Sequence, residues 1–231
     1  MDLDHLLSRS AMLEERIESL FALPMPTDSA RIRAVLTITS LGFEHARSLK
    51  YLVAARLYTS SAALLRIQYE SLVRAIWVLH CASDADAELI ISELTQESAK
   101  RADRIPMLSK MLEEIERDAP NVPVAQLKEF KFYSWRPLSS FVHGGIHAVN
   151  RHGRGFPPEL VSMQVRHSNG LLSLAGSLLQ VIAGVPPERQ IMGKLFKEFE
   201  PCFPPLESPN ESQQGADAEV GQNRGVLSDQ L

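Results

Sequence analysis

Apolar residues recur along this chain at the three- and four-residue spacing of amphipathic helices. The first such stretch, residues 3–23, carries leucine and isoleucine at helical intervals and stops at Pro24 and Pro26. No segment shows the alternating pattern of a half-buried strand. The pattern predicts nine helices, over residues 3–23, 30–58, 60–82, 84–101, 105–118, 124–134, 137–144, 159–183 and 188–199.

Capping and turn residues set the expected boundaries of these helices. Residues 27–29 (Thr-Asp-Ser) provide N-caps for the second helix. Pro137 suits the first position of a helix, because its missing N–H has no intrahelical partner there. Gly144 and Gly145 weaken the end of that helix, and residues 150–158 are predicted to form a loop.

The composition of the chain changes near residue 201. From there onward proline, glutamate, glutamine, serine and glycine dominate and large apolar residues are sparse, which is typical of disorder. The sequence therefore predicts an all-α fold, with a single helical bundle of about seven to nine helices over residues 1–200 and a disordered tail over 201–231.

Length and charge narrow the function classes. A chain of 231 residues with 45% hydrophobic residues can bury a core, and a net charge of −4 argues against binding long nucleic acid by bulk charge. Cys81 and Cys202 are too few for a disulfide framework. Neither a basic leader nor an apolar stretch of membrane length is present, so we expect a cytoplasmic protein that does not enter a membrane.

The third predicted helix carries a polar stripe although it is apolar on most of its circumference. Such a helix is expected to be central. Arg66, Glu70 and Arg74 stand four residues apart, so they share one face, and Trp77 lies close to the end of that stripe. They form either a solvated ladder or the lining of an internal cleft, in which Glu70 would hold both arginines and one arginine would face a ligand.

The second helix adds His45, which falls among apolar residues of its inner face, beside Glu44. A histidine in that position is either a core residue with its hydrogen bonds satisfied or a group that points into the same cleft.

Residues 135–155 hold most of the candidate chemistry, with three histidines, three arginines and four glycines. Arg136 and His143 are seven residues apart, so both project from one face of a helix. A histidine that moves a proton and an arginine that stabilises phosphorane charge suit phosphodiester cleavage without a metal. Alternatively, Arg136 pairs with a carboxylate such as Glu70, and His143 hydrogen-bonds between helices.

Other chemistry in this segment is less well supported. His143 and His147 have a spacing that suits zinc, and His152 would supply a third ligand, but the glycine pair weakens the helix that would hold them. Arg151 belongs to a short basic run that would contact phosphate or remain solvated. The sequence contains no phosphate-binding loop and no nucleophile elbow, so we expect neither a metal nor a cofactor.

Two segments resemble a bacterial all-helical family of unknown function. Residues 65–77 are similar to its Arg-x3-Glu-x3-Arg-x2-Trp helix, and residues 140–145 to its His-Gly-Gly segment, with Arg151 downstream. Glu44 and His45 also match the pattern, and the order and separation of the blocks agree over residues 30–185. This family implies no established activity.

The chain is more distantly similar to HEPN-like helical bundles. Many of these are metal-independent endoribonucleases, or toxin and phage-defence components, with an Arg-x(4–6)-His motif that is completed across a dimer. This resemblance implies Arg136 as the phosphate-stabilising residue and His143 as the general acid or base. Pro137 replaces the polar residue that usually follows the arginine, so Ser139 or Ser140 would have to take its place.

We interpret the chain as an uncharacterised helical bundle whose polar cluster binds a ligand or partner without catalysis. The predicted binding residues are His45, Arg66, Glu70, Arg74, Gly144, Gly145 and Arg151. The alternative is a HEPN-like endoribonuclease that uses Arg136 and His143, so whether the protein is an enzyme stays open. We expect a homodimer, with RNA or a small anionic ligand as the partner.

Overall fold

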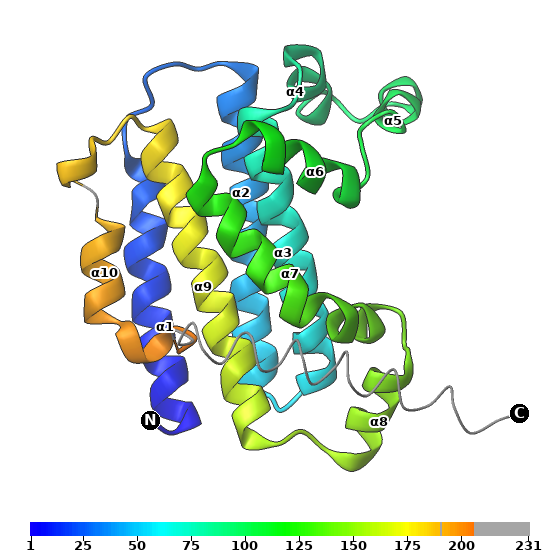
Figure 1. Ribbon diagram of the computed structural model, residues 1–231, viewed down its shortest axis with the longest axis vertical. Coiled ribbons are helices and arrows are strands. Elements are labelled where there is room, and N and C mark those ends of the chain that lie inside the picture. The colour runs from blue at the N-terminus through cyan, green and yellow to red at the C-terminus, as the bar shows by residue number, and fades with distance from the viewer. Residues whose placement is uncertain (190, 206–231) are drawn as a thin grey trace, which may run out of the picture.

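The computed structural model describes residues 1–189 and 191–205. These residues form ten α-helices, three short 3₁₀ helices and no strand, so the all-α expectation is confirmed with slightly more helices than predicted (Figure 1). The α-helices are α1 (Leu3–Glu18), α2 (Ala30–Ala54), α3 (Tyr58–His80), α4 (Asp84–Ile90), α5 (Gln96–Ala102), α6 (Leu108–Asp118), α7 (Asn121–Val142), α8 (Ile146–Arg154), α9 (Pro158–Ile182) and α10 (Met192–Glu198). The 3₁₀ helices are η1 (Ser19–Ala22), η2 (Pro187–Arg189) and η3 (Glu200–Cys202).

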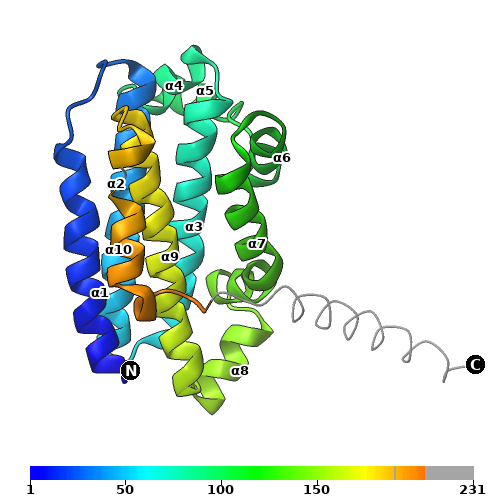
Figure 2. The ribbon, with the colours of Figure 1, turned by 60° about the vertical axis from the view of Figure 1, so that its left-hand side comes forward.

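Three long helices, α2, α3 and α9, make the centre of the bundle. Helices α2 and α3 lie side by side, α9 packs against α1, α2 and α3, and α6 and α7 cover the outer side of α3 (Figures 1 and 2). The core includes Tyr69 and Ile76 of α3, both almost fully buried. The prediction that α3 is central is therefore confirmed, because its apolar circumference packs against neighbours on several sides.

Two predicted helices end or break earlier than their periodicity indicated. The second helix ends at Ala54, because Arg56 adopts a left-handed backbone with a φ of 62° that turns the chain into α3. The predicted helix over 84–101 is two helices, because Thr95 starts α5 with a capping box that it forms with Ser98. Periodicity alone does not detect such local turns.

Pro137 lies inside α7 rather than at the start of a helix, so the two helices predicted over 124–134 and 137–144 are one. The proline ring removes one main-chain hydrogen bond and favours a kink, and Figure 1 shows α7 changing direction near its C-terminal end. Packing holds the helix together on both sides of the proline, because Trp135 contacts α3 and Leu138 is buried.

Helix α8 occupies part of the segment that the sequence predicted as a loop. Gly144, with a φ of 65°, makes the turn out of α7, and the Ser140 hydroxyl then accepts hydrogen bonds from the backbone N–H groups of His147 (2.9 Å) and Ala148 (3.4 Å). A Cβ atom on Gly145 would lie 2.7 Å from the Ser140 Oγ, so a larger residue at this position would displace that hydroxyl. A residue of α7 therefore caps α8.

The packed region extends to Phe203, beyond the expected boundary at residue 200. Phe199, Cys202 and Phe203 are buried, and the side chain of Asn169 donates a hydrogen bond to the Cys202 carbonyl at 2.9 Å. Residues 206–231, which make up most of the predicted tail, lie outside the described residues.

A membrane-spanning helix is absent from the part of the chain that the structure describes, since none of its helices combines sufficient length with sufficient apolar character.

Candidate functional site

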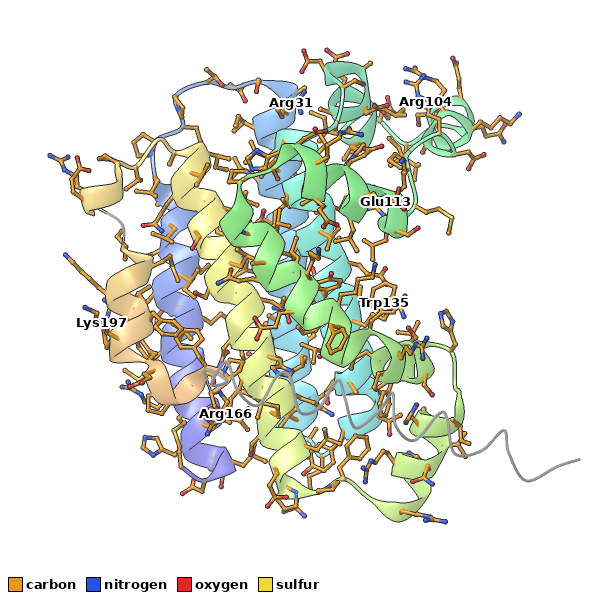
Figure 3. The ribbon with its side chains drawn as sticks, viewed as in Figure 1. Arg31, Arg104, Glu113, Trp135, Arg166 and Lys197 are labelled. Atoms are coloured by element: carbon orange, nitrogen blue, oxygen red, sulfur yellow. The ribbon has the colours of Figure 1, made fainter. Side chains whose placement is uncertain are left out.

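The predicted stripe on α3 forms part of the interface between α3 and α7. The Arg66 Nε donates to the Glu70 Oε1 at 2.7 Å, and another guanidinium nitrogen donates to the Ser139 hydroxyl. The guanidinium carbon lies 3.7 Å from the centre of the Trp135 ring, which projects from α7 beside α3 (Figure 3). Only 12% of the Arg66 side chain is exposed. The stripe is therefore not simply a solvated ladder, because Arg66 joins two helices.

Aromatic rings near Arg66 extend the interface between α3 and α7. Tyr69 stacks on Phe130 with 4.7 Å between ring centres and meets Trp135 edge-on at 6.0 Å. The Tyr69 hydroxyl donates to the Leu127 carbonyl at 3.0 Å, and burial raises the pKa of that hydroxyl. Tyr69 is therefore a neutral structural group, and the cluster around Arg66 is built for packing.

Glu70 holds one arginine and not both. No ion pair joins Arg74 to Glu70 within residues 1–189 and 191–205, and Arg74 is half-buried. Trp77 is buried at the end of the stripe and donates from its indole nitrogen to the Glu114 carboxylate of α6 at 2.7 Å. The three predicted stripe residues thus share one helix face, but the ion pair is confined to Arg66 and Glu70.

His45 is half-buried on α2. Burial lowers the pKa of its imidazole, and the neighbouring Glu44 carboxylate partly offsets that shift. The ring is therefore neutral at neutral pH. No hydrogen bond links it to the α3 stripe among the residues that the structure describes, so a shared cleft stays a prediction.

Arg136 and His143 are both exposed at the C-terminal end of α7. The structure gives neither side chain a hydrogen bond or an ion pair among the described residues, and His143 is the C-cap of α7. Arg66, not Arg136, makes the ion pair with Glu70. The two residues therefore remain accessible to a ligand.

Helix α8 places the remaining predicted site residues at one end of the bundle. Gly144 and Gly145 form the turn before it, Arg151 is half-buried in its last turn, and a ring nitrogen of His152 lies 3.4 Å from the Thr59 hydroxyl of α3. Across the described chain, histidine, cysteine, aspartate and glutamate side chains form no group of three that could hold a metal ion.

Helices α7 and α8 and their flanking turns carry an excess of basic side chains that no single motif revealed. Residues 121–157 contain five lysines and arginines against one carboxylate, although the whole chain has a net charge of −4. Large apolar side chains are exposed on the same two helices. We define the α7–α8 face by Lys128, Phe132, Arg136, His143, Ile146, Val149, Arg151 and Arg154.

Sequence reasoning missed a second polar cluster, which links α1 to α2. The Glu14 carboxylate accepts hydrogen bonds from the Lys50 ammonium at 2.5 Å and from the Arg47 Nε at 2.7 Å. The side chains of Glu14 and Lys50 are only 6% and 9% exposed. The signal that could have identified them is their position among apolar residues on the buried faces of their helices.

A family model matches the chain. No curated protein and no solved structure matches the chain. The sequence model of a family of unknown function, DUF6988, matches residues 39–205. This range covers more than half of the chain and includes the α3 stripe, the α7–α8 face and the C-terminal packed segment. The chain therefore belongs to the DUF6988 family, a family of unknown function.

Proposed function

We propose that this protein is a non-catalytic module that binds single-stranded RNA on its α7–α8 face. The observation that carries the proposal is a stripe on α7 in which Phe132 lies between Lys128 and Arg136. These residues are four apart, so they stand one above the other on one side of the helix. All three are exposed, and Phe132 is 67% exposed.

This arrangement matches the chemistry of an unpaired nucleic acid strand. Lysine and arginine bind phosphates, and an exposed aromatic ring stacks on a base without reading its sequence. A base that stacks on Phe132 would cover this ring while the neighbouring cations contact the backbone.

The basic face continues from α7 onto α8. Arg151 and Arg154 lie in the last turn of α8, and neither forms an ion pair with a described residue. Lys128 is paired with the exposed Glu116 at 2.5 Å, and such exposed pairs contribute little. The cations are therefore available to phosphates. The open face suits an extended strand better than the small anionic ligand that we also considered.

The α3 stripe supports a binding role over a catalytic one. Arg66 is engaged with Glu70 and with Ser139 of α7, so the pair stabilises the helix that presents the face. Their proposed contribution is positioning, and ligand contact would come from the exposed residues of α7 and α8.

The alternative function is a HEPN-like endoribonuclease, and one observation favours it. Arg136 and His143 are both exposed near the C-terminal end of α7. In that case Arg136 would stabilise the phosphorane, and His143 would transfer the proton at the 2′-hydroxyl or the leaving oxygen. The homodimer and the cytoplasmic location stay predictions.

The binding test uses a fluorescently labelled single-stranded RNA and measures its anisotropy with the full chain at low salt. We expect Phe132→Ala to weaken binding roughly 5- to 150-fold, because stacking contributes about 1–3 kcal/mol per base. The matched control is Tyr51→Ala, which removes a 70% exposed aromatic ring from α2 and should leave the affinity unchanged. Absence of binding, or equal effects of the two variants, would contradict the proposal.

The same RNA separates binding from cleavage. Incubation with EDTA, followed by gel analysis, should leave the RNA intact if the protein only binds. Cleavage that resists EDTA, produces cyclic phosphate ends and disappears in His143→Ala would contradict the binding proposal and support the ribonuclease.

A further inference from the structure

A groove of about 740 Å³ opens at the end of the bundle where α1, α3 and α9 begin. Its volume lies within the range of small-molecule sites, which is about 300–1,000 Å³. Three helices that are far apart in sequence build its walls, so no local motif indicates it. The residues that carry the argument below are Leu3, Tyr58, Phe156, Val161, Met163 and Arg166.

Most of the groove wall is apolar. Tyr58 and Phe156 form a tilted aromatic pair with 5.6 Å between ring centres, and Phe156 is held from behind by Phe141 at 5.9 Å. Val161 and Met163 of α9 and Leu3 of α1 add aliphatic and thioether surface. This wall suits the apolar part of a ligand, because aromatic rings offer flat apolar surface and the flexible methionine side chain adjusts to the shape of a hydrocarbon group.

Among the described residues that line the groove, Arg166 is the one with a cationic side chain. It lies on α9 near the end of α10 (Figure 3), and its hydrogen bond to the Phe203 carbonyl is a long one, 3.4 Å. Asp2 and Glu159 also line the groove, but neither forms an ion pair with Arg166. Asp2 instead caps α1 through the backbone N–H of His5. The half-buried guanidinium therefore retains donors for an anion.

We infer that this groove binds an amphiphilic monoanion, an alkyl or aryl carboxylate. The carboxylate would pair with Arg166, whose planar fork matches it, and the apolar body would lie on Tyr58, Phe156 and Met163. The first turns of α1 and α9 add favourable partial positive charge at the same end of the bundle. This site lies outside the RNA-binding proposal and does not depend on it.

The test follows the methionine methyl resonances of the full chain by NMR during titration with decanoate below its micelle concentration. The Met163 methyl reports on the groove, and the Met107 methyl, which is exposed before α6 and does not line the groove, is the internal control. We expect a saturable shift of Met163 with no shift of Met107. Decanol, which lacks the charge, should bind more weakly.

Two variants test the residue roles. Arg166→Gln keeps a polar side chain and should weaken decanoate binding roughly 10- to 100-fold, while decanol binding stays the same. Ser162→Phe, at a half-buried position in the groove wall, should reduce binding of both ligands.

Three results would overturn the inference. They are a Met163 resonance that decanoate does not shift, equal shifts of Met163 and Met107, and wild-type affinity in Arg166→Gln.

Discussion

The Glu14–Lys50 pair offers the sharpest stability test, because both groups are buried and they carry opposite charges. Glu14→Gln keeps the shape of the side chain but removes its charge. Lys50 then remains almost buried beside the Arg47 guanidinium, without a counter-charge. Breaking a buried pair in this way costs about 3–5 kcal/mol. We expect the lower end of this range, because the glutamine amide oxygen can still accept one hydrogen bond.

The loss should depend on pH with a defined sign. Burial lowers the pKa of Lys50 below its ordinary value, Glu14 opposes this shift, and Arg47 reinforces it. A lysine whose pKa is lower in the folded state binds fewer protons there than in the unfolded state, so stability rises as the pH approaches 10.5. Without Glu14 the Lys50 pKa falls further. The destabilisation should therefore shrink toward alkaline pH, by at most about 1.4 kcal/mol per pH unit.

Urea unfolding followed by circular dichroism, at neutral pH and at about pH 9.5, measures both effects. Glu18→Gln is the matched control, because Glu18 pairs with the same Arg47 at 2.6 Å but is 47% exposed, and it should cost at most about 1 kcal/mol. The double variant Glu14→Leu with Lys50→Met should recover much of the stability. A loss below about 1 kcal/mol for Glu14→Gln, or a loss that does not change with pH, would refute the reasoning.

Three further predictions concern packing and capping. Gly176→Ala should destabilise the protein by about 1–3 kcal/mol in chemical denaturation, because the new methyl would lie 2.6 Å from a methionine sulfur of α10. The matched control is Gly193→Ala, whose methyl meets nothing within 4 Å and which should be neutral or stabilising. Gly145→Ala should increase hydrogen exchange in α8, because its methyl displaces the serine that caps this helix, while Gly153→Ala should leave exchange unchanged or slower. Arg66→Lys retains the charge but loses the flat stack on tryptophan, so unfolding should show a loss of about 1 kcal/mol; an unchanged midpoint would contradict this assignment.

Several elements follow from local sequence rules and agree with the structure. The N-cap predicted at residues 27–29 is realised by Ser29, whose hydroxyl accepts from the Ile32 N–H. The predicted central place of α3 follows from its apolar circumference. These inferences succeed because caps and amphipathic periodicity act over a few residues and need no knowledge of distant neighbours.

The α7–α8 region shows where local rules fail. Pro137 is favourable at the first turn of a helix, and this preference predicted a boundary that tertiary packing overrides. Trp135 and Leu138 hold α7 continuous, and Ser140 supplies a cap for α8 that is visible only after the chain has folded back. Burial therefore has more influence than local helix preference on where α7 ends and α8 begins.

The sequence by itself determined that the chain is a bundle of helices, the order of these helices and which residues share a face, because helical periodicity and capping are properties of neighbouring residues. Only the tertiary structure decided that Arg66 stacks on Trp135, that Glu14 meets Lys50, and that α1, α3 and α9 line a groove that includes Arg166. These contacts join segments far apart in the chain, and burial decides which polar groups must find a partner and which remain open to a ligand.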